Sequence, residues 1–377
     1  MIAAVRSLVS VNESVLYVAF ELGQKDWKLA MTSGFAAKPW LRTIAAGDLA
    51  AVERTIGAAR RRFGVSASAR VISCDEAGRD GFWIHRALQR LGIANRVVDS
   101  ASIDVNRRAR RMKTDRLDAV KLVLKLVRVC AGDQDAWQEV QVPSAEVEAA
   151  RHQSRERTAL IQERTRLRNQ VGSWLATCGC RVSRRTRQQP AWWTTVRDWA
   201  AAPLPAPVQA RIARATVRLA VVDQQIATID RAQAATAQAA APASAQARLV
   251  RLKGVATTSA AVLLEEGLEW RGFRNRRQIG GLLGFAPAKY DSGASSRDQG
   301  ITRAGNTRLQ AVMTQLAWSW VHWQPQSALS RWYRERFGRG KRARKVGIVA
   351  LARKLLIALW RYATAGVVPA GAVLKVG

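Results

Sequence analysis

The sequence predicts an α/β domain at the N-terminus, a helical arm in the middle and a mostly α-helical C-terminal domain. Three observations support this order. Strand-like and helix-like segments alternate as far as Pro143, which is typical of an α/β fold. Acidic residues then become sparse and the pattern is continuously helical, and from Leu249 onward short helical segments are joined by basic turns. We therefore expect domains at 1–143, 144–248 and 249–377.

The charge of the chain predicts its class of partner. Among 377 residues, 61 are Lys or Arg and 28 are Asp or Glu, which gives a net charge of +33. Such an excess indicates a polyanion, first of all nucleic acid, because phosphate contacts dominate affinity for basic proteins. An anionic membrane surface is the second choice. No uncharged apolar run reaches about 18 residues, so we expect no membrane-spanning helix.

Short strands and helices are expected in the first domain. Val15–Met31 predicts a β-hairpin, because its Val, Tyr and Phe residues favour strands. Next we expect an amphipathic helix at Asp48–Phe63, a buried strand at Val71–Cys74 and a helix at Gly81–Gly92 that is ended by glycine. A strand at Arg96–Asp99 and a last helix at Thr114–Cys130 follow.

Four acids stand at the ends of these elements. Glu21 closes the first strand, Glu76 follows the buried strand with Asp75 as its competitor, and Asp115 and Asp118 lie one turn apart on the last helix. Mg²⁺ prefers oxygen ligands, and two-metal phosphoryl transfer needs several converging carboxylates. The last two acids alone also fit a simple complement to the helix dipole. Four such acids in one basic domain favour a site for Mg²⁺, with Mn²⁺ as a substitute.

A basic stretch leads into the last pair of acids. Arg107–Ala119 reads RRARRMKTDRLDA, in which six of thirteen residues are basic. We predict that it guides nucleic acid toward the carboxylates through Arg107, Arg108, Arg110, Arg111 and Lys113.

The middle of the chain predicts two long helices, Val147–Ala176 and Val208–Ala235, with apolar residues at three- and four-residue spacing. They indicate an antiparallel coiled coil that serves as a spacer or an oligomerisation arm. A plain helical hairpin packed on its own domain is equally compatible. Ala234–Ala247 has the composition of a linker.

The third domain begins with a segment, LVRLKGVATTSAAVLLEEG, that resembles a helix-hairpin-helix. Its turn at Gly254 would direct backbone N–H groups at a phosphate. The third position of such a turn is usually glycine, whereas this chain has Ala256. A tight helical turn without a ligand is the alternative.

A second candidate site lies in an expected loop around Ser292 and Gly293, followed by Arg303, Asn306 and Arg308. Arginines and glycine N–H groups can hold a phosphate while a serine hydroxyl attacks it. A basic loop that only contacts the DNA backbone is the alternative, and it fits the spacing at least as well.

Two sets of motifs resemble a known family. The segment CDEAGRDGFW and the later TDRLDA resemble the RuvC-like (RNase H-like) DEDD domain of the Piv/MooV recombinases, the transposases of insertion-sequence family one-hundred-and-ten. The segment from LKGVATTS to NTRLQ resembles the C-terminal transposase domain of that family, whose signature is a proline, a Ser-Gly and a basic Gly-Asn. The resemblance covers nearly the whole chain.

The resemblance implies a role for each candidate residue. It implies that Glu21, Glu76, Asp115 and Asp118 bind Mg²⁺, and that Ser292 forms a transient 5′-phosphoserine bond with DNA. The first acid of the family is usually aspartate, so Glu21 is a departure. It also implies a bridge RNA that pairs with target and donor DNA, and a dimer or tetramer in which acids and serine of one site come from different subunits. Separately, the four cysteines do not form a disulfide framework, which favours a reducing cytoplasm, and we expect a prokaryotic, nucleoid-associated protein.

Two other functions remain open at the level of sequence. A Mg²⁺-dependent structure-specific endonuclease, resembling a Holliday-junction resolvase, would use the four acids and water. A non-enzymatic scaffold for DNA or RNA would use the acids only structurally.

Overall fold

The computed structural model describes residues 14–103, 115–133, 135–285, 287–292, 295–301, 305–338 and 340–375. The predicted basic track Arg107–Lys113 and Arg303 lie outside these ranges. For Asp115 and Ser292 only the backbone is described. The chain divides into two compact units, Met1–Pro143 and Ser144–Gly377.

The first unit contains a five-stranded mixed sheet with strand order β3-β2-β1-β4-β5. Its strands are β1 (Leu16–Leu22), β2 (Asp26–Thr32), β3 (Trp40–Ala45), β4 (Val71–Glu76) and β5 (Ala94–Val98). The first three pair antiparallel, and β4 and β5 run parallel to β1. The α/β prediction and the β1–β2 hairpin are confirmed, while β3 was not predicted.

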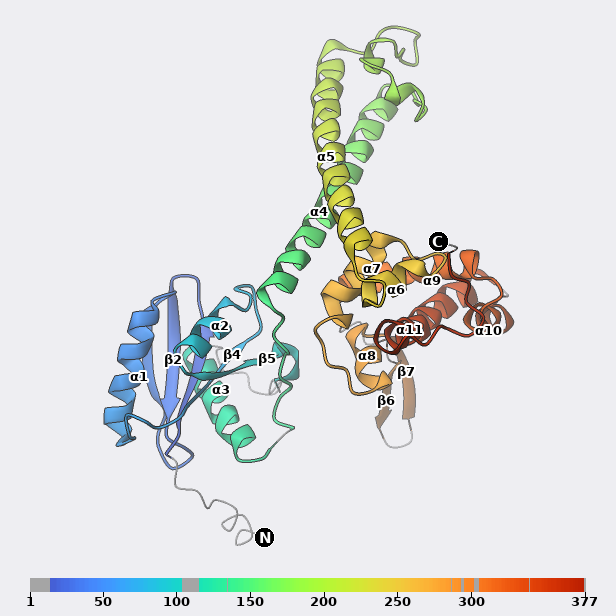
Figure 1. Ribbon diagram of the computed structural model, residues 1–377. Coiled ribbons are helices and arrows are strands. Elements are labelled where there is room, and N and C mark those ends of the chain that lie inside the picture. Colours follow the sequence, from blue (N-terminus) through green and yellow to red (C-terminus); the bar gives the residue numbers. More distant parts are fainter. Residues whose placement is uncertain are drawn as a thin grey trace. The chain divides into compact units, whose positions relative to one another are not determined.

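Helices cover both faces of this sheet. They are α1 (Leu49–Phe63), α2 (Trp83–Arg90) and α3 (Asp115–Cys130) (Figure 1). Phe20 and its neighbours on one face pack with Val52 of α1 and Leu88 of α2. On the other face, Ala19 and Cys74 pack with α3. Side chains along a strand alternate between the two faces, so neighbouring residues of β1 and β4 point to different cores.

Helix α3 follows the spacing of a helix with one buried side. Ala119, Leu122, Val123 and Leu126 are buried in the core on its face of the sheet, at the i, i+3, i+4 and i+7 positions of one helix face. Asp118 precedes Leu122 by one turn and so lies at the start of this sheet-facing side.

The second unit begins with two long helices, α4 (Ala145–Thr177) and α5 (Ala206–Ala239), which lie side by side in Figure 1. Four ion pairs join them: Arg157–Asp230, Arg164–Asp223, Arg168–Asp223 and Arg218–Glu163. Partners earlier in α4 lie later in α5, so the helices are antiparallel, as predicted. We call α4, α5 and the connecting segment 178–205 the arm.

The arm is held mainly by its apolar seam. Leu167, Val171 and Leu175 of α4 are buried, as are Ile212 and Val222 of α5. Exposed ion pairs contribute about 0–1 kcal/mol each, so they set the register more than the stability. Helix α5 continues to Ala239, which shortens the predicted linker to the few residues before α6.

The remainder of the second unit is mostly helical. Its elements are α6 (Ala245–Arg251), α7 (Thr257–Leu263), a π-helix (Leu264–Leu268), α8 (Arg276–Leu282), β6 (Pro287–Ser292), β7 (Ser295–Ile301), α9 (Thr307–Trp323), α10 (Ala328–Phe337) and α11 (Lys341–Ala365). They share one core around Leu263, Met313, Trp320 and Leu355. Across the described ranges, no helix combines the length and apolarity needed to cross a membrane.

The segment predicted as the serine loop forms a β-hairpin instead. Strands β6 and β7 pair antiparallel, with Ser292 opposite Ser295. The polar sequence YDSGASSRDQG indicated a loop because it lacks a buried apolar face. Backbone pairing is compatible with such a sequence, because paired strands can be polar on both faces.

Candidate functional site

Two predicted acids line one cavity at the ends of neighbouring strands. The cavity of about 380 Å³ is bordered by Glu21 and Glu76 and by the glycine-containing turn after β4. Phe20 of β1 pairs with Asp75 of β4, so the two glutamates occupy the next positions of adjacent parallel strands. Glu21 lies two residues after Ala19, and Glu76 lies two residues after Cys74. Because side chains two residues apart in a strand point to the same face, both glutamates belong to the face covered by α3.

Helix α3, which contains the other two predicted acids, packs on this face of the sheet. Asp118 directly precedes the buried Ala119, is about one-fifth exposed, and its carboxylate lies 3.5 Å from the Lys121 ammonium. Asp115 begins the helix one turn earlier. The cavity lining contains Glu21 and Glu76 but no described residue of α3. Among the described residues, no three Asp, Glu, His or Cys side chains form a metal-binding group.

Asp75 belongs to a different environment from Glu76. Asp75 is buried, and Asn95 Nδ2 donates a 2.6 Å hydrogen bond to its carboxylate. Asn95 Oδ1 in turn accepts a 2.6 Å hydrogen bond from the Ser73 hydroxyl. Burial raises the pKa of Asp75 to about 6, and the Asn95 hydrogen bond lowers it only in part. Asp75 is thus part of an internal polar cluster, whereas Glu76 borders the cavity.

Ser292 lies at the last position of β6, paired with Ser295 at the first position of β7. The chain then enters α9 through Asn306, whose Oδ1 accepts hydrogen bonds from the backbone N–H groups of Arg308 and Leu309, both 3.1 Å. This is an N-cap, which satisfies donors that the first turn of a helix leaves unpaired.

Sequence reasoning missed a buried carboxylate, Glu266, at the centre of the second unit. Its oxygens accept hydrogen bonds from Asn306 Nδ2 at 2.9 Å, Arg308 Nη1 at 3.0 Å and Arg155 Nε at 3.2 Å. The guanidinium of Arg151 lies 3.5 Å away. Glu266 therefore joins the start of α9 to the arm helix α4. The described side-chain contacts of Asn306 and Arg308, which we predicted to bind nucleic acid, are internal.

The neighbouring Glu265 and Glu266 have opposite electrostatic environments. Burial raises the pKa of Glu265 to about 7, with a smaller lowering from its hydrogen bond with Ser154. Burial also acts to raise the pKa of Glu266, but hydrogen bonds from Arg155 and Asn306 and the charges of Arg155 and Arg151 outweigh it and lower this pKa to about 2. Arg308 connects the surroundings of the two glutamates: besides its bond to Glu266, its Nη2 donates to the Ser154 hydroxyl, the partner of Glu265, at 2.6 Å.

The raised pKa of Glu265 predicts a pH-dependent stability. Because its folded pKa lies above the unfolded value, the protonated form stabilises the fold at low pH, and this contribution is lost as pH rises from about 4.5 through about 7. We expect Glu265→Gln to reduce the loss of unfolding free energy between pH 5.5 and 8.5 by on the order of 2 kcal/mol. Urea unfolding at both pH values measures it. Glu156→Gln, on an exposed position of α4, should leave the pH dependence unchanged; an equal effect of both variants would contradict the prediction.

The predicted hairpin turn at Gly254 packs tightly on α9. Gly254 has φ +89°, and a Cβ there would lie 3.0 Å from Trp323 Cβ. Its carbonyl accepts a 2.8 Å hydrogen bond from Ser319 Oγ, and the Lys253 carbonyl accepts one from Gln324 Nε2, also 2.8 Å. Glycine is needed here for backbone conformation and close packing.

Comparisons with known proteins identify relatives of the chain. Residues 246–332 match the family described as Transposase IS116/IS110/IS902. The chain is 38% identical to the "Putative transposase y4rJ" of Sinorhizobium fredii, over 97% of this chain and 96% of that protein. It is 30% identical to the "Probable family 20 transposase" of Pseudomonas aeruginosa, over 61% of this chain and 68% of that protein.

Proposed function

The chain belongs to the IS116/IS110/IS902 family of insertion-sequence transposases, and from this premise we propose that it is an RNA-guided DNA recombinase with a DEDD carboxylate site and a serine nucleophile. As a transposase it is an enzyme that cleaves and rejoins DNA. The observation that carries the carboxylate site is the shared cavity of Glu21 and Glu76. The cavity lies at the ends of β1 and β4, and the two glutamates alternate in phase with Ala19 and Cys74, which pack against α3, the helix that contains Asp115 and Asp118. This arrangement supports a RuvC-like assignment of the first unit.

Magnesium is the proposed cofactor of this site. The donor groups fit the ion, because Glu21 and Glu76 offer carboxylate oxygens to one cavity and Mg²⁺ prefers oxygen ligands. With Asp115 and Asp118 they would hold Mg²⁺, which when bound offsets the negative charge that builds up on a phosphate during attack. The longer arm of Glu21 takes the place of the usual aspartate.

Ser292 is the proposed nucleophile. Its hydroxyl oxygen forms a bond to phosphorus, the P–O3′ bond breaks, and the serine proton passes overall to the departing 3′ oxygen. The product is a 5′-phosphoserine and a free 3′-hydroxyl. Reversal by another 3′-hydroxyl rejoins DNA with no external energy source. The position of Ser292 at the end of strand β6 supports this role, because functional residues are often placed where a rigid element ends.

Glu76→Gln and Asp75→Asn form a matched pair that tests the carboxylate site. Glu76→Gln removes one proposed metal-binding charge, so we expect strand joining to fall on the order of 10²-fold or more. Asp75→Asn keeps an acceptor for Asn95 in the internal cluster, so we expect little change in rate. Joining of labelled DNA under single-turnover conditions, at several Mg²⁺ concentrations, measures both. Loss of joining in Asp75→Asn alone would assign the second acid to Asp75 instead.

A reconstitution tests guidance by RNA. The purified protein, RNA transcribed from the element's flanking sequence and both DNA partners should recombine, and omission of the RNA should stop recombination. Changing the RNA's pairing segment should move the target site accordingly. Recombination of the same target without RNA would overturn this part of the proposal. Cutting of branched DNA without joining would instead favour a structure-specific endonuclease.

A further inference from the structure

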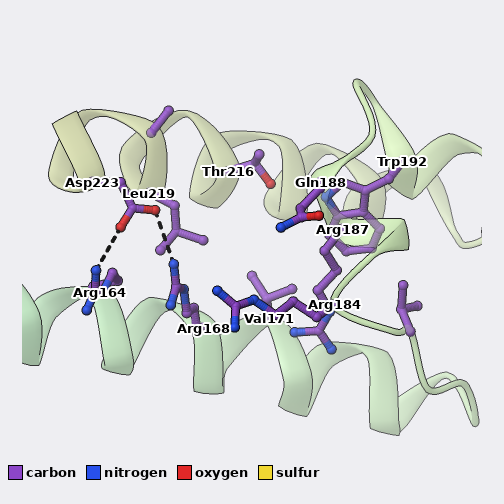
Figure 2. Close-up of a pocket in the computed structure, with 12 residues that line it drawn as sticks. Arg164, Arg168, Val171, Arg184, Arg187, Gln188, Trp192, Thr216, Leu219 and Asp223 are labelled. Carbon is purple, nitrogen blue, oxygen red and sulfur yellow. Dashed lines mark hydrogen bonds and ion pairs between the residues drawn. The ribbon is translucent and has the colours of Figure 1, made fainter. Parts of the chain in front are cut away.

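The arm contains a cavity of about 870 Å³ between α4, α5 and the connecting segment. Figure 2 shows the residues around it. The lining combines apolar and basic side chains: Arg164, Arg168, Val171, Val182, Arg184, Arg187, Gln188, Trp192, Thr216, Leu219, Ala220 and Asp223. The cavity shares no residue with the carboxylate site, the serine hairpin or the Glu266 network.

The charge around this cavity is strongly unbalanced. Four of its lining residues are arginines and one is an acid. Asp223 is bound by Arg164 and Arg168, each at 3.2 Å, which Figure 2 marks with dashed lines. Arg184 and Arg187 come from the connecting segment and form no ion pair with any residue that the structure describes. One carboxylate therefore faces four guanidinium groups, and the cavity attracts anions.

Arg187 provides a second, independent indication of a ligand. Its Nε is buried and has no hydrogen-bond partner among the described residues. The guanidinium lies 5.9 Å from the centre of the Trp192 ring, and Trp192 is itself buried. Burying a donor without a partner is unfavourable. An acceptor bound in the cavity would satisfy this donor.

We propose that this cavity binds a phosphodiester group of a nucleic-acid strand. The planar guanidinium presents two parallel N–H donors that match two oxygens of a phosphate. Gln188 adds a polar side chain, while Val171 and Leu219 provide apolar wall suited to the sugar beside the phosphate. The cavity is much larger than a single phosphate ion, which favours a strand over free phosphate. This assignment gives the arm a nucleic-acid contact of its own, beyond the proposed cleavage chemistry.

The Nε–H resonance of Arg187 in the full chain reports on this cavity locally, whatever the other basic surfaces bind. Its ¹⁵N–¹H signal is assigned by its loss in Arg187→Lys. We titrate three probes at constant ionic strength: inorganic phosphate, a short single-stranded DNA and the same sequence as RNA. We expect the signal to shift and saturate with an oligonucleotide at a lower concentration than with phosphate.

Two neighbouring arginines provide the matched variants. Arg184→Gln, in the lining, should raise the oligonucleotide midpoint of this shift about tenfold, whereas Arg185→Gln, one residue outside the lining, should leave it within about twofold. Both remove one charge from the same exposed segment, and Arg184→Lys should recover part of the affinity. A shift by DNA or by RNA supports the proposal and identifies the strand. A shift by phosphate alone, equal effects of both Gln variants, or no shift with any probe overturns it.

Discussion

Ser292→Ala is expected to abolish both the covalent protein–DNA adduct and strand joining, with DNA binding retained. The variant lacks the only oxygen that the proposed mechanism uses to attack the phosphate, so the rate of joining should fall on the order of 10⁴-fold or more. The adduct is measured as labelled DNA that stays with the protein in denaturing gels, with the label on the fragment that begins at the attacked phosphate. Binding is measured separately, at several salt concentrations.

Ser295→Ala is the matched control for this experiment. Ser295 is the strand partner of Ser292, so the substitution alters the same end of the hairpin by the same single oxygen. We expect it to retain the adduct. An adduct lost in Ser295→Ala and kept in Ser292→Ala would move the nucleophile across the hairpin. DNA cutting at full rate by Ser292→Ala would leave the serine mechanism without support and favour hydrolysis by water.

Glu266→Gln should be among the most destabilising single substitutions in the second unit. The Glu266 side chain is fully buried, and the guanidiniums of Arg151 and Arg308 are only 13% and 15% exposed. Removing the carboxylate leaves these cations without a counter-charge in a poorly solvated place, which costs about 3–5 kcal/mol. Urea unfolding of the full chain, followed by the transition of the second unit, measures the loss.

The pH dependence of this loss has a defined sign. The folded pKa of Glu266 is lowered to about 2, so its stabilisation is present above the unfolded value and disappears as pH falls from about 4.5 toward 2. The variant and the parent should therefore converge in stability at the acid end. Glu269→Gln, an exposed position three residues away, should change stability by no more than about 0.5 kcal/mol. A Glu266→Gln effect as small as that would mean that the arginines are well solvated.

Most of the first unit could be predicted because its strands and helices bury one side each. The alternation in VLYVAFEL and the spacing in α3 identify buried faces directly. Strand β3 was missed because it is a sheet edge with no fully buried residue. Its pairing with β2 depends on a neighbour, and local sequence does not report that. The choice of Glu76 over Asp75 was made from sequence. The two side chains point to opposite faces of the sheet, and it is Glu76 that borders the cavity.

The second unit shows the limit of reading charge from sequence. Asn306 and Arg308 stand in a basic segment, so exposure to nucleic acid was the natural expectation. Their partner Glu266 precedes them by 40 and 42 residues, and no local pattern connects them. A signal was nevertheless present: Glu265 and Glu266 interrupt the apolar run AAVLLEEGLEW. Acids inside an apolar helix are rarely buried without partners, so a search for distant cations was justified.

With Ser292 as the proposed nucleophile, the β6–β7 hairpin would act as a lever on the reaction. Strand β6 spans six residues from Pro287 to Ser292, or roughly 17 Å at about 3.4 Å per residue. A tilt of about 10° at its base would move the far end by roughly 3 Å, comparable to the whole reacting distance of about 3–3.5 Å between an attacking atom and its target. The pairing is irregular between Pro287 and Lys289, near that base, where a bulge re-aims a strand. In the proposed mechanism, small changes at the foot of the hairpin would therefore decide whether the serine reaches phosphorus, and DNA that contacts the hairpin along its length would influence its own cleavage rate.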